Sequence, residues 1–265
     1  MRNLVKAELF KLNKNKIFLI LIIINLLSIL YGAGIKYKFS FVNFSGDFDI
    51  FRYVFSIWQL YFILGIPMII LMYAGSKILG DEIAKGQILL EVAPVANRKK
   101  LLSAKFIAMI YSTLYFILTN IIINVIVYMI FVKGTEYYAE TQIFRQENLE
   151  MLIQIIFGFL EIYLLTMIAM LFSIDYGAII GTLFSMAFYI ITSLLSRSTT
   201  IDKYVPGYFN FKGDCIINFE IVLIQLSLFA ILIFVVLKLS LNKFNKKDIW
   251  KLINHAFICY NWFGD

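Results

Sequence analysis

The chain has 265 residues, of which 61% are hydrophobic and only 15% are charged, and it carries a net charge of +7. Soluble domains average roughly 45–50% apolar and about 25% charged residues, so this composition excludes a water-soluble globular protein. Apolar runs recur from residue 17 to residue 241 and leave no stretch for a second, globular domain.

The apolar runs have the length and pattern of membrane-spanning helices. A helix needs roughly 20 apolar residues to cross about 30 Å of hydrocarbon. Runs such as 17–24 and 223–239 do not alternate in polarity, which favours helices over a closed barrel. We therefore predict an all-α integral membrane protein with a single transmembrane domain over residues 1–265. The six predicted spans are 17–35, 54–79, 102–132, 150–172, 177–196 and 217–241.

Residues 1–16 precede the first span and carry an amphipathic pattern. Val5, Leu9 and Leu12 share one face of a helix, and lysines occupy other faces. This pattern favours a short helix lying in the membrane interface, although a positively charged topology anchor is the alternative. The first apolar run is longer than the apolar core of a usual signal peptide, so we interpret it as a retained helix.

The basic residues predict an orientation. Of the 24 Lys and Arg residues, 16 lie in 1–16, 77–105 and 238–265, and the other 8 lie in the segments between. Basic residues accumulate on the cytoplasmic side of a membrane, so these three segments and both termini are predicted to be cytoplasmic. Because the basic residues flank helices and form no compact patch, they indicate a membrane surface rather than a nucleic-acid partner.

Several segments outside the spans have a pattern of their own. The segment 80–101 joins the second and third spans and contains a short apolar stretch before Pro94, which fits either a docking helix or a solvated loop. Aromatic residues beside Pro206 in 197–216 fit either a structure in the outer interface or an anchored loop. The tail 242–265 is predicted to be a basic amphipathic helix on the inner leaflet.

Enzyme chemistry has no support in the sequence. There is no H-E-x-x-H, no G-x-S-x-G and no phosphate-binding loop, so we predict no catalytic residue and no ATP hydrolysis on this chain. His255 is the only histidine and has no partner at ligand spacing, so no metal site is predicted. Cys215 and Cys259 fall on opposite sides of the predicted membrane, which excludes a disulfide between them within one chain.

A few polar residues lie inside the predicted spans. Glu161 is near the middle of 150–172, where an ionisable group is costly and is a candidate for function. Asn120, Asn124 and Gln225 are in other spans, and any of them could hydrogen-bond to Glu161. Both a structural bond between helices and a direct role in transport remain open for these residues.

Two stretches of the chain resemble a known family. The first is the N-terminal sequence MRNLVKAELFKL, which is followed by a Lys/Asn break and a long apolar span. The second runs from Asp81-Glu82 through Gly86 and Pro94 to Arg98-Lys99-Lys100 and Ala104-Lys105. Together with the length and the six spans, they resemble permease subunits of type-2 ABC exporters, in particular the bacitracin- and lantibiotic-resistance permeases.

The resemblance implies an elbow helix at the N-terminus and a coupling helix in 80–101 that docks on a separate ATP-binding subunit. That subunit would carry the ATP and magnesium, and this chain no cofactor. Two permease chains would form a homo- or heterodimer, and the segment around Pro206 would correspond to short helices that dip into the membrane. The docking residues implied in this way are Glu82, Lys85, Gly86, Glu91, Pro94 and Arg98.

The resemblance therefore predicts a multi-pass protein of a bacterial cell membrane that exports a hydrophobic or amphipathic substrate. An antimicrobial peptide, an antibiotic or a lipid fits the apolar spans, with antibiotic resistance or immunity as the role. The alternatives are a membrane scaffold or sensor that transports nothing and a secondary transporter or channel. The halves show no convincing internal symmetry of the kind expected for a secondary transporter.

Overall fold

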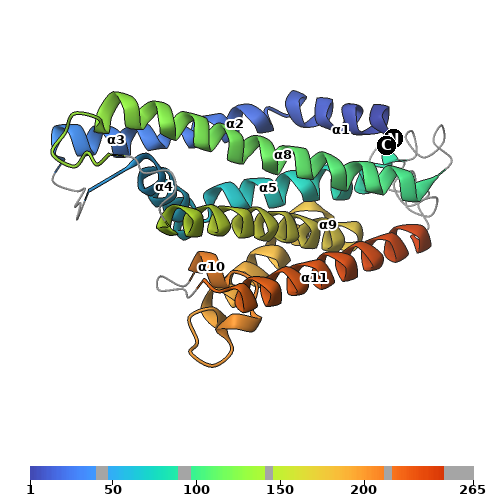
Figure 1. Cartoon of the computed structure of the whole chain (residues 1–265). Helices are drawn as coiled ribbons and strands as arrows, with labels where there is room; N and C mark the ends of the chain where they lie inside the picture. The colour runs from blue at the N-terminus through green and yellow to red at the C-terminus, as the bar shows by residue number, and fades with distance from the viewer. Residues whose placement is uncertain (40–46, 89–96, 141–145, 212–216, 248–265) are drawn as a thin grey trace.

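The structure is a computed structural model that describes residues 1–39, 47–88, 97–140, 146–211 and 217–247, and within these ranges the chain forms helices and no strand. The long helices run side by side along one axis (Figure 1). The elements are α1 (Arg2–Lys14), α2 (Ile17–Asn25), α3 (Leu27–Tyr37), α4 (Ile50–Leu64), α5 (Ile66–Ser76), the π-helix η1 (Lys77–Asp81), α6 (Glu82–Ala84), α8 (Arg98–Val127), the π-helix η2 (Tyr128–Val132), α9 (Gln146–Leu195), the 3₁₀-helix η3 (Asp202–Tyr204), α10 (Tyr208–Phe211) and α11 (Phe219–Lys246).

The described helices include several that are long and apolar enough to cross a membrane. Four qualify individually, and one bent pair of helices would make a fifth. This confirms, for the described residues, the prediction of a helical chain with helices that are long and apolar enough to cross a membrane. The four helices are Ile17–Tyr37, Arg98–Val132, Glu147–Leu195 and Phe219–Lys246, and the bent pair is Ile50–Leu64 with Ile66–Ala84.

The run predicted as one span, 54–79, is divided into two helices. α4 and α5 meet at an angle of 62°. The break falls at Gly65, which has a left-handed φ of 66°, and Pro67 follows in the first turn of α5. Glycine ends a helix in this conformation at little cost, and proline at a helix start lacks only an N–H that has no helical partner. The predicted second span is therefore bent, and α4 and α5 form either a broken span or a re-entrant loop.

The chain reverses its direction within α9. Gly177 has φ 81° and ψ 176°, a conformation that is essentially restricted to glycine. The residues on either side of it pack against each other, because Ser185 Oγ donates to the Leu165 carbonyl at 2.6 Å. The close approach also involves Gly181, where a Cβ atom would lie 2.5 Å from the Ala169 carbonyl oxygen. α9 is thus a helical hairpin, and its break coincides with the start of the predicted span 177–196.

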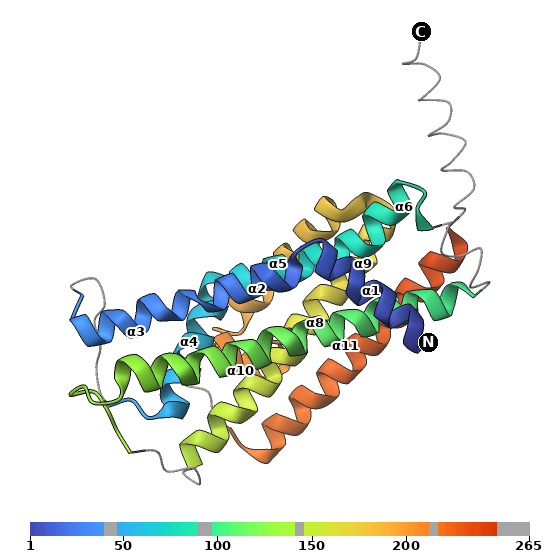
Figure 2. The ribbon, with the colours of Figure 1, turned by 90° about the horizontal axis from the view of Figure 1, so that it is seen from above.

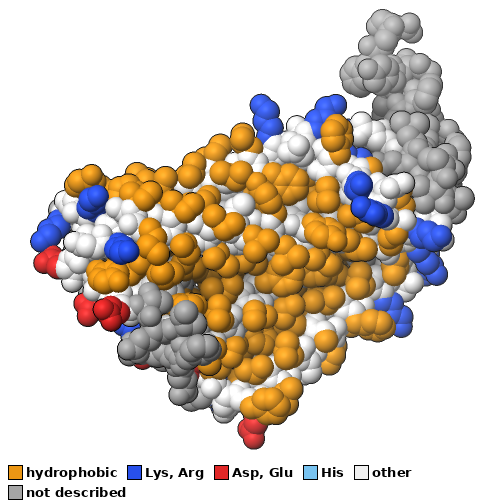
Figure 3. Space-filling model, turned by 45° about the horizontal axis from the view of Figure 1, so that its top comes forward, with side chains coloured by type: hydrophobic (Ala, Val, Ile, Leu, Met, Phe, Trp, Pro, Cys, Tyr) orange, Lys and Arg blue, Asp and Glu red, His pale blue; other side chains and the backbone are white. Residues whose placement is uncertain are grey.

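The hairpin α9 forms the centre of the bundle, and α11 lies at its margin. In the most apolar part of α9, 72% of the residues are buried within the protein, against 22% for α11. The remaining apolar side chains form a broad band on the surface, and most of the charged side chains in view lie toward the two ends (Figure 3). This division fits a helical bundle that exposes an apolar belt to lipid.

The two ends of the bundle differ in which segments they gather. One end, called here the α1 end, brings together α1, α6, the start of α8 and the end of α11 (Figures 1 and 2). Arg98 Nη1 donates to the Lys247 carbonyl at 3.0 Å, and Lys243 pairs with Asp175 beside the α9 reversal. The opposite end, called the α3 end, holds the end of α3 and the segments 47–49 and 133–139.

The predicted N-terminal helix is present as α1. Its direction changes from that of α2 at Lys16, which has a positive φ of 60°. Val5 and Leu12 are buried, and α1 packs on α8 and η1. The apolar face of α1 is therefore covered by protein. The predicted helix in the tail 242–265 lies outside the described residues except for the end of α11.

Candidate functional site

A cluster of buried charges lies at the α1 end. Lys105 Nζ is 2.9 Å from Glu8 Oε1 and 2.5 Å from Glu82 Oε2. Lys11 Nζ is 3.0 Å from Glu8 Oε1 and 2.9 Å from Glu82 Oε1. We call these four residues the ionic cluster. It joins three helices that are far apart in the sequence, namely α1, α6 and α8.

The ionic cluster contains two lysines and two carboxylates, and most of it is buried. The side chain of Lys105 is fully buried and that of Glu8 is 2% exposed, whereas Lys11 is 31% exposed at the rim. Two ammonium groups neutralise two carboxylates. Removing one partner from a buried ion pair typically costs about 3–5 kcal/mol, because an uncompensated charge stays behind. The cluster therefore holds the three helices in one arrangement.

Local helix geometry brings the carboxylates into place. Glu8 and Lys11 are three residues apart and share the face of α1 that also buries Val5 and Leu12. On the other side, the π-helix η1 precedes Glu82. A π turn contains one residue more than an α turn, which rotates the following residues by about 100° around the helix. This rotation turns Glu82 toward α1 and α8.

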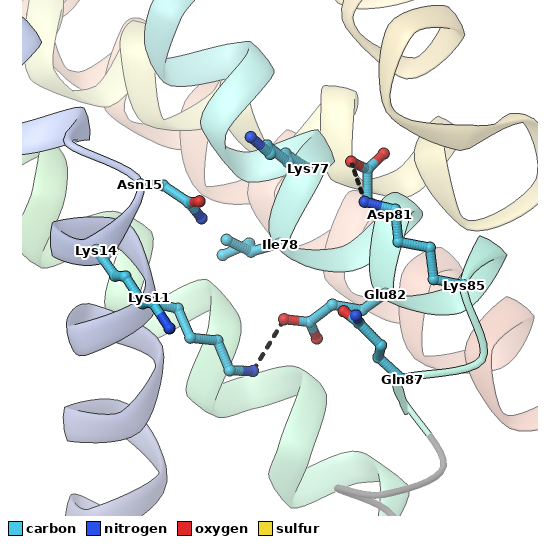
Figure 4. A pocket seen from close by; sticks show the side chains of 9 residues that line it. All are labelled: Lys11, Lys14, Asn15, Lys77, Ile78, Asp81, Glu82, Lys85 and Gln87. Carbon is cyan, nitrogen blue, oxygen red and sulfur yellow. Dashed lines mark hydrogen bonds and ion pairs between the residues drawn. The ribbon is translucent and has the colours of Figure 1, made fainter.

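A pocket of about 390 Å³ adjoins the ionic cluster (Figure 4). One wall is formed by the end of α1 and the turn after it, and the other wall by η1, α6 and the residues that follow. The lining residues are Lys11, Lys14, Asn15, Lys77, Ile78, Asp81, Glu82, Lys85 and Gln87. Four of these nine residues are lysines and two are acidic.

The predicted docking residues have separate positions. Glu82 lies in the ionic cluster, where its carboxylate pairs with Lys11 and Lys105. Lys85 is exposed, with Nζ 3.7 Å from Asp81 Oδ2, and Gly86 has a left-handed φ of 68° in the turn after α6. Arg98 bonds to carbonyls at the end of α11. The other two predicted docking residues, Glu91 and Pro94, lie outside the described residues.

A second buried carboxylate lies within the bundle. Glu161 in α9 is 1% exposed, and its Oε2 accepts a hydrogen bond from Asn210 Nδ2 at 3.0 Å. Its Oε1 has no hydrogen-bond partner within the described ranges. No cation faces Glu161 in an ion pair there. Glu161 therefore differs from the carboxylates of the ionic cluster in having an amide as its partner.

Asn210 belongs to a short segment, 202–211, that packs between α9 and α11. Gln225 Nε2 in α11 donates to the carbonyls of Lys203 and Val205 at 2.9 and 3.0 Å. Gly207 has a φ of 95°, and a Cβ atom there would lie 2.8 Å from Glu161 Oε1. This segment contains η3 and α10, and its buried side chains include Tyr208 and Phe209.

The other predicted intramembrane residues form separate contacts. Asn120 Nδ2 donates to Asn25 Oδ1 at 3.0 Å, and this bond joins α8 to α2. Asn124 is buried and has no hydrogen-bond partner in the described ranges. Gln225 supports the 202–211 segment. In the described ranges Asn210, and none of these three residues, is the hydrogen-bond partner of Glu161.

Sequence reasoning missed several of these partners. Asn210 lies 49 residues from Glu161 in a segment that has no periodic pattern. Glu8 and Lys105 were part of the family resemblance but were not predicted as a pair. A signal was available for Glu8, since it occupies the apolar face of α1. Within the described ranges, no group of three or more His, Cys, Asp or Glu side chains could hold a metal ion.

The described residues form a helical bundle with several helices long and apolar enough to cross a membrane, and charged groups join α1, α6 and α8 at one end. Comparisons with family models, with curated proteins and with solved structures found no match to the chain. Function is therefore inferred from the geometry and from the sequence resemblance.

Proposed function

We propose that the chain crosses the membrane six times, with both termini in the cytoplasm. Six crossings follow if the bent pair α4 and α5 counts as one span and each arm of the α9 hairpin crosses once. The α1 end contains the described residues 1–16, 77–88 and 97–105, which are rich in Lys and Arg. The positive-inside tendency then assigns this end to the cytoplasm. In this orientation α1 is the elbow helix.

We propose further that the protein is the permease subunit of an ATP-driven exporter. The observation that carries this proposal is the ionic cluster, because it joins both sides of the segment 85–97 to one another. α6 precedes the segment, α8 follows it, and Lys105 bonds to Glu82 across it. A displacement of this segment by a partner would therefore move α1, α5 and α8 together.

The mechanism is a two-state switch that is biased from outside this chain. A separate ATP-binding subunit, with its ATP and magnesium, would dock on the segment 85–97 and change its position on nucleotide binding. A ligand shifts such an equilibrium only by its difference in affinity for the two states. Two permease chains would enclose the path of a hydrophobic or amphipathic substrate, such as an antimicrobial peptide, an antibiotic or a lipid, in a bacterial cell membrane.

The docking proposal is tested by co-expression with a candidate ATP-binding subunit. Lys85→Glu reverses an exposed charge next to the docking segment, and its side chain is 61% exposed. Lys133→Glu makes the same charge change at the α3 end and serves as the control. We expect the ATPase to co-purify with wild type and with Lys133→Glu, and to be lost or reduced with Lys85→Glu, because surface charges determine register and specificity.

Co-purification and ATPase stimulation that are unchanged in Lys85→Glu would contradict docking at this site. Failure of wild type to bind any ATPase would favour the scaffold or sensor instead. A reversal at Glu82 is not a useful test, since it would place a positive charge against Lys105 in the buried cluster.

A further inference from the structure

The pocket at the α1 end has an excess of positive charge. Four lysines and two carboxylates line it, which leaves a net charge of +2. Lys11 is paired with Glu8 and Glu82, and Lys85 lies beside Asp81. In the described part of the chain, the two remaining lysines of the pocket, Lys14 and Lys77, have no carboxylate partner.

The free lysines belong to opposite walls. Lys14 is the last residue of α1, and Lys77 opens η1. In Figure 4 the Lys77 ammonium points toward the α1 wall, where the Asn15 amide faces the pocket. Lysine is a common ligand of phosphate as a compact positive charge, and an amide N–H adds a hydrogen-bond donor. The volume of about 390 Å³ is at the small end of ligand sites and suits a single phosphate-containing headgroup.

The level of the pocket along the bundle favours a lipid as the source of this phosphate. Lys14 lies three residues before the span that begins at Ile17, so the pocket is at the boundary between the apolar band and the α1 end. Lys77 Nζ lies 5.8 Å from the centre of the Tyr73 ring, and Tyr73 is 38% exposed. Aromatic and cationic side chains are typical of the membrane interface.

We propose that this pocket binds the phosphate group of an anionic phospholipid of the inner leaflet, with Lys14 and Lys77 as the phosphate ligands. Basic pockets beside membrane helices on the cytoplasmic side are suited to anionic headgroups. The bound lipid would bridge α1 and η1, next to the ionic cluster. This site does not depend on the export proposal, because a scaffold or a sensor with the same fold would bind the lipid equally.

Native mass spectrometry of the full chain in detergent tests the site. Phosphatidylglycerol and phosphatidylcholine are added at equal concentration, and the retained lipid is counted for wild type and for Lys14→Gln with Lys77→Gln. We expect wild type to retain phosphatidylglycerol in preference to phosphatidylcholine. In the double variant, the preference for phosphatidylglycerol over phosphatidylcholine should fall about fivefold for each lysine removed. Each lysine contributes one favourable contact to an anionic lipid.

The control is Lys36→Gln with Lys133→Gln, which removes the same charge at the α3 end and should retain phosphatidylglycerol like wild type. Both double variants must elute as monodisperse protein, and their substituted side chains lie outside the buried core. Equal retention of phosphatidylglycerol by wild type and by the Lys14 and Lys77 variant overturns the proposal. A separate arm uses soluble glycerol phosphate. Equally strong binding of glycerol phosphate would assign the pocket to a soluble phosphate and overturn the lipid assignment.

Discussion

Two of the buried acidic regions in the described part of the protein are built differently. In the ionic cluster, Glu8 and Glu82 share two lysines, one of which is fully buried. In the bundle interior, Glu161 has one amide partner, Asn210, and a second oxygen without a partner in the described ranges. The first region joins helices by charge, and the second holds a short segment against α9 by a hydrogen bond.

This difference leads to different expectations for substitution. A balanced ionic cluster becomes strongly unfavourable when one charge is removed, because the remaining charges stay buried. A carboxyl group that has only an amide partner contributes mainly as a hydrogen-bonding group, worth about 0.5–1.5 kcal/mol.

The largest loss is expected for Lys105→Met, which leaves Glu8 and Glu82 with Lys11 alone. The free energy of unfolding should fall by about 3–5 kcal/mol. Thermal unfolding of the detergent-solubilised protein measures it. Lys99→Met, at an exposed position in the first turn of α8, is the control. A further variant, Lys105→Met with Glu82→Gln, should be less destabilised than the sum of its single changes, because the two residues interact directly. If the losses in unfolding free energy of the two single variants simply added up in the double variant, the direct contact between Lys105 and Glu82 would be contradicted.

An intermediate effect is expected for Gly207→Ala. Its new Cβ atom would meet Glu161 Oε1 at 2.8 Å, and overpacking of this kind costs about 1–3 kcal/mol. Gly134→Ala is a matched control, since Gly134 also has a positive φ, of 87°, but has no atom near the added Cβ. The thermal unfolding temperature should fall further for Gly207→Ala than for Gly134→Ala. Equal losses would mean that backbone conformation alone matters and that the 202–211 segment is not tightly packed.

A smaller effect is expected at Glu161 itself. Glu161→Gln keeps an acceptor for the Asn210 amide and should preserve assembly, with a change in stability of less than about 1 kcal/mol. Glu161→Leu removes the acceptor and leaves that amide buried without a partner, which costs about 1–3 kcal/mol. Thermal unfolding and substrate export are measured for both. Wild-type values for both variants would remove Glu161 from any structural or transport role.

The smallest effect is expected for the exposed ion pair between Lys38 and Glu136 at the α3 end, where Lys38 Nζ lies 2.8 Å from Glu136 Oε1. The hydrogen bond from Lys38 lowers the pKa of Glu136 below its ordinary value. A carboxyl group whose pKa is lowered in the folded state stabilises that state at pH values above its ordinary pKa. This stabilisation is lost as the pH falls through the lowered pKa. Because both side chains are mostly exposed, solvent screens the pair, and Lys38→Gln should not change the thermal unfolding temperature at neutral pH. A clear decrease would contradict the contrast with the ionic cluster.

The sequence predicts the helices of this protein better than their contacts. Long apolar runs indicate helices because a lipid-exposed backbone must bond internally. The bend at Gly65 was not predicted, although a Gly-x-Pro pattern marks it. The pairing of Glu161 with Asn210 and of Glu8 with Lys105 could not be read from spacing, because tertiary packing brings together residues that are 49 and 97 positions apart.

Accessibility labelling in intact cells tests the predicted orientation most directly. In a background with Cys215→Ser and Cys259→Ser, the variants Lys85→Cys and Lys133→Cys are treated with a thiol reagent that does not cross membranes. We expect the Lys133→Cys variant to be labelled in intact cells and the Lys85→Cys variant to be labelled only after lysis. Labelling of the Lys85→Cys variant in intact cells would place the α1 end outside, where no ATPase could dock on it.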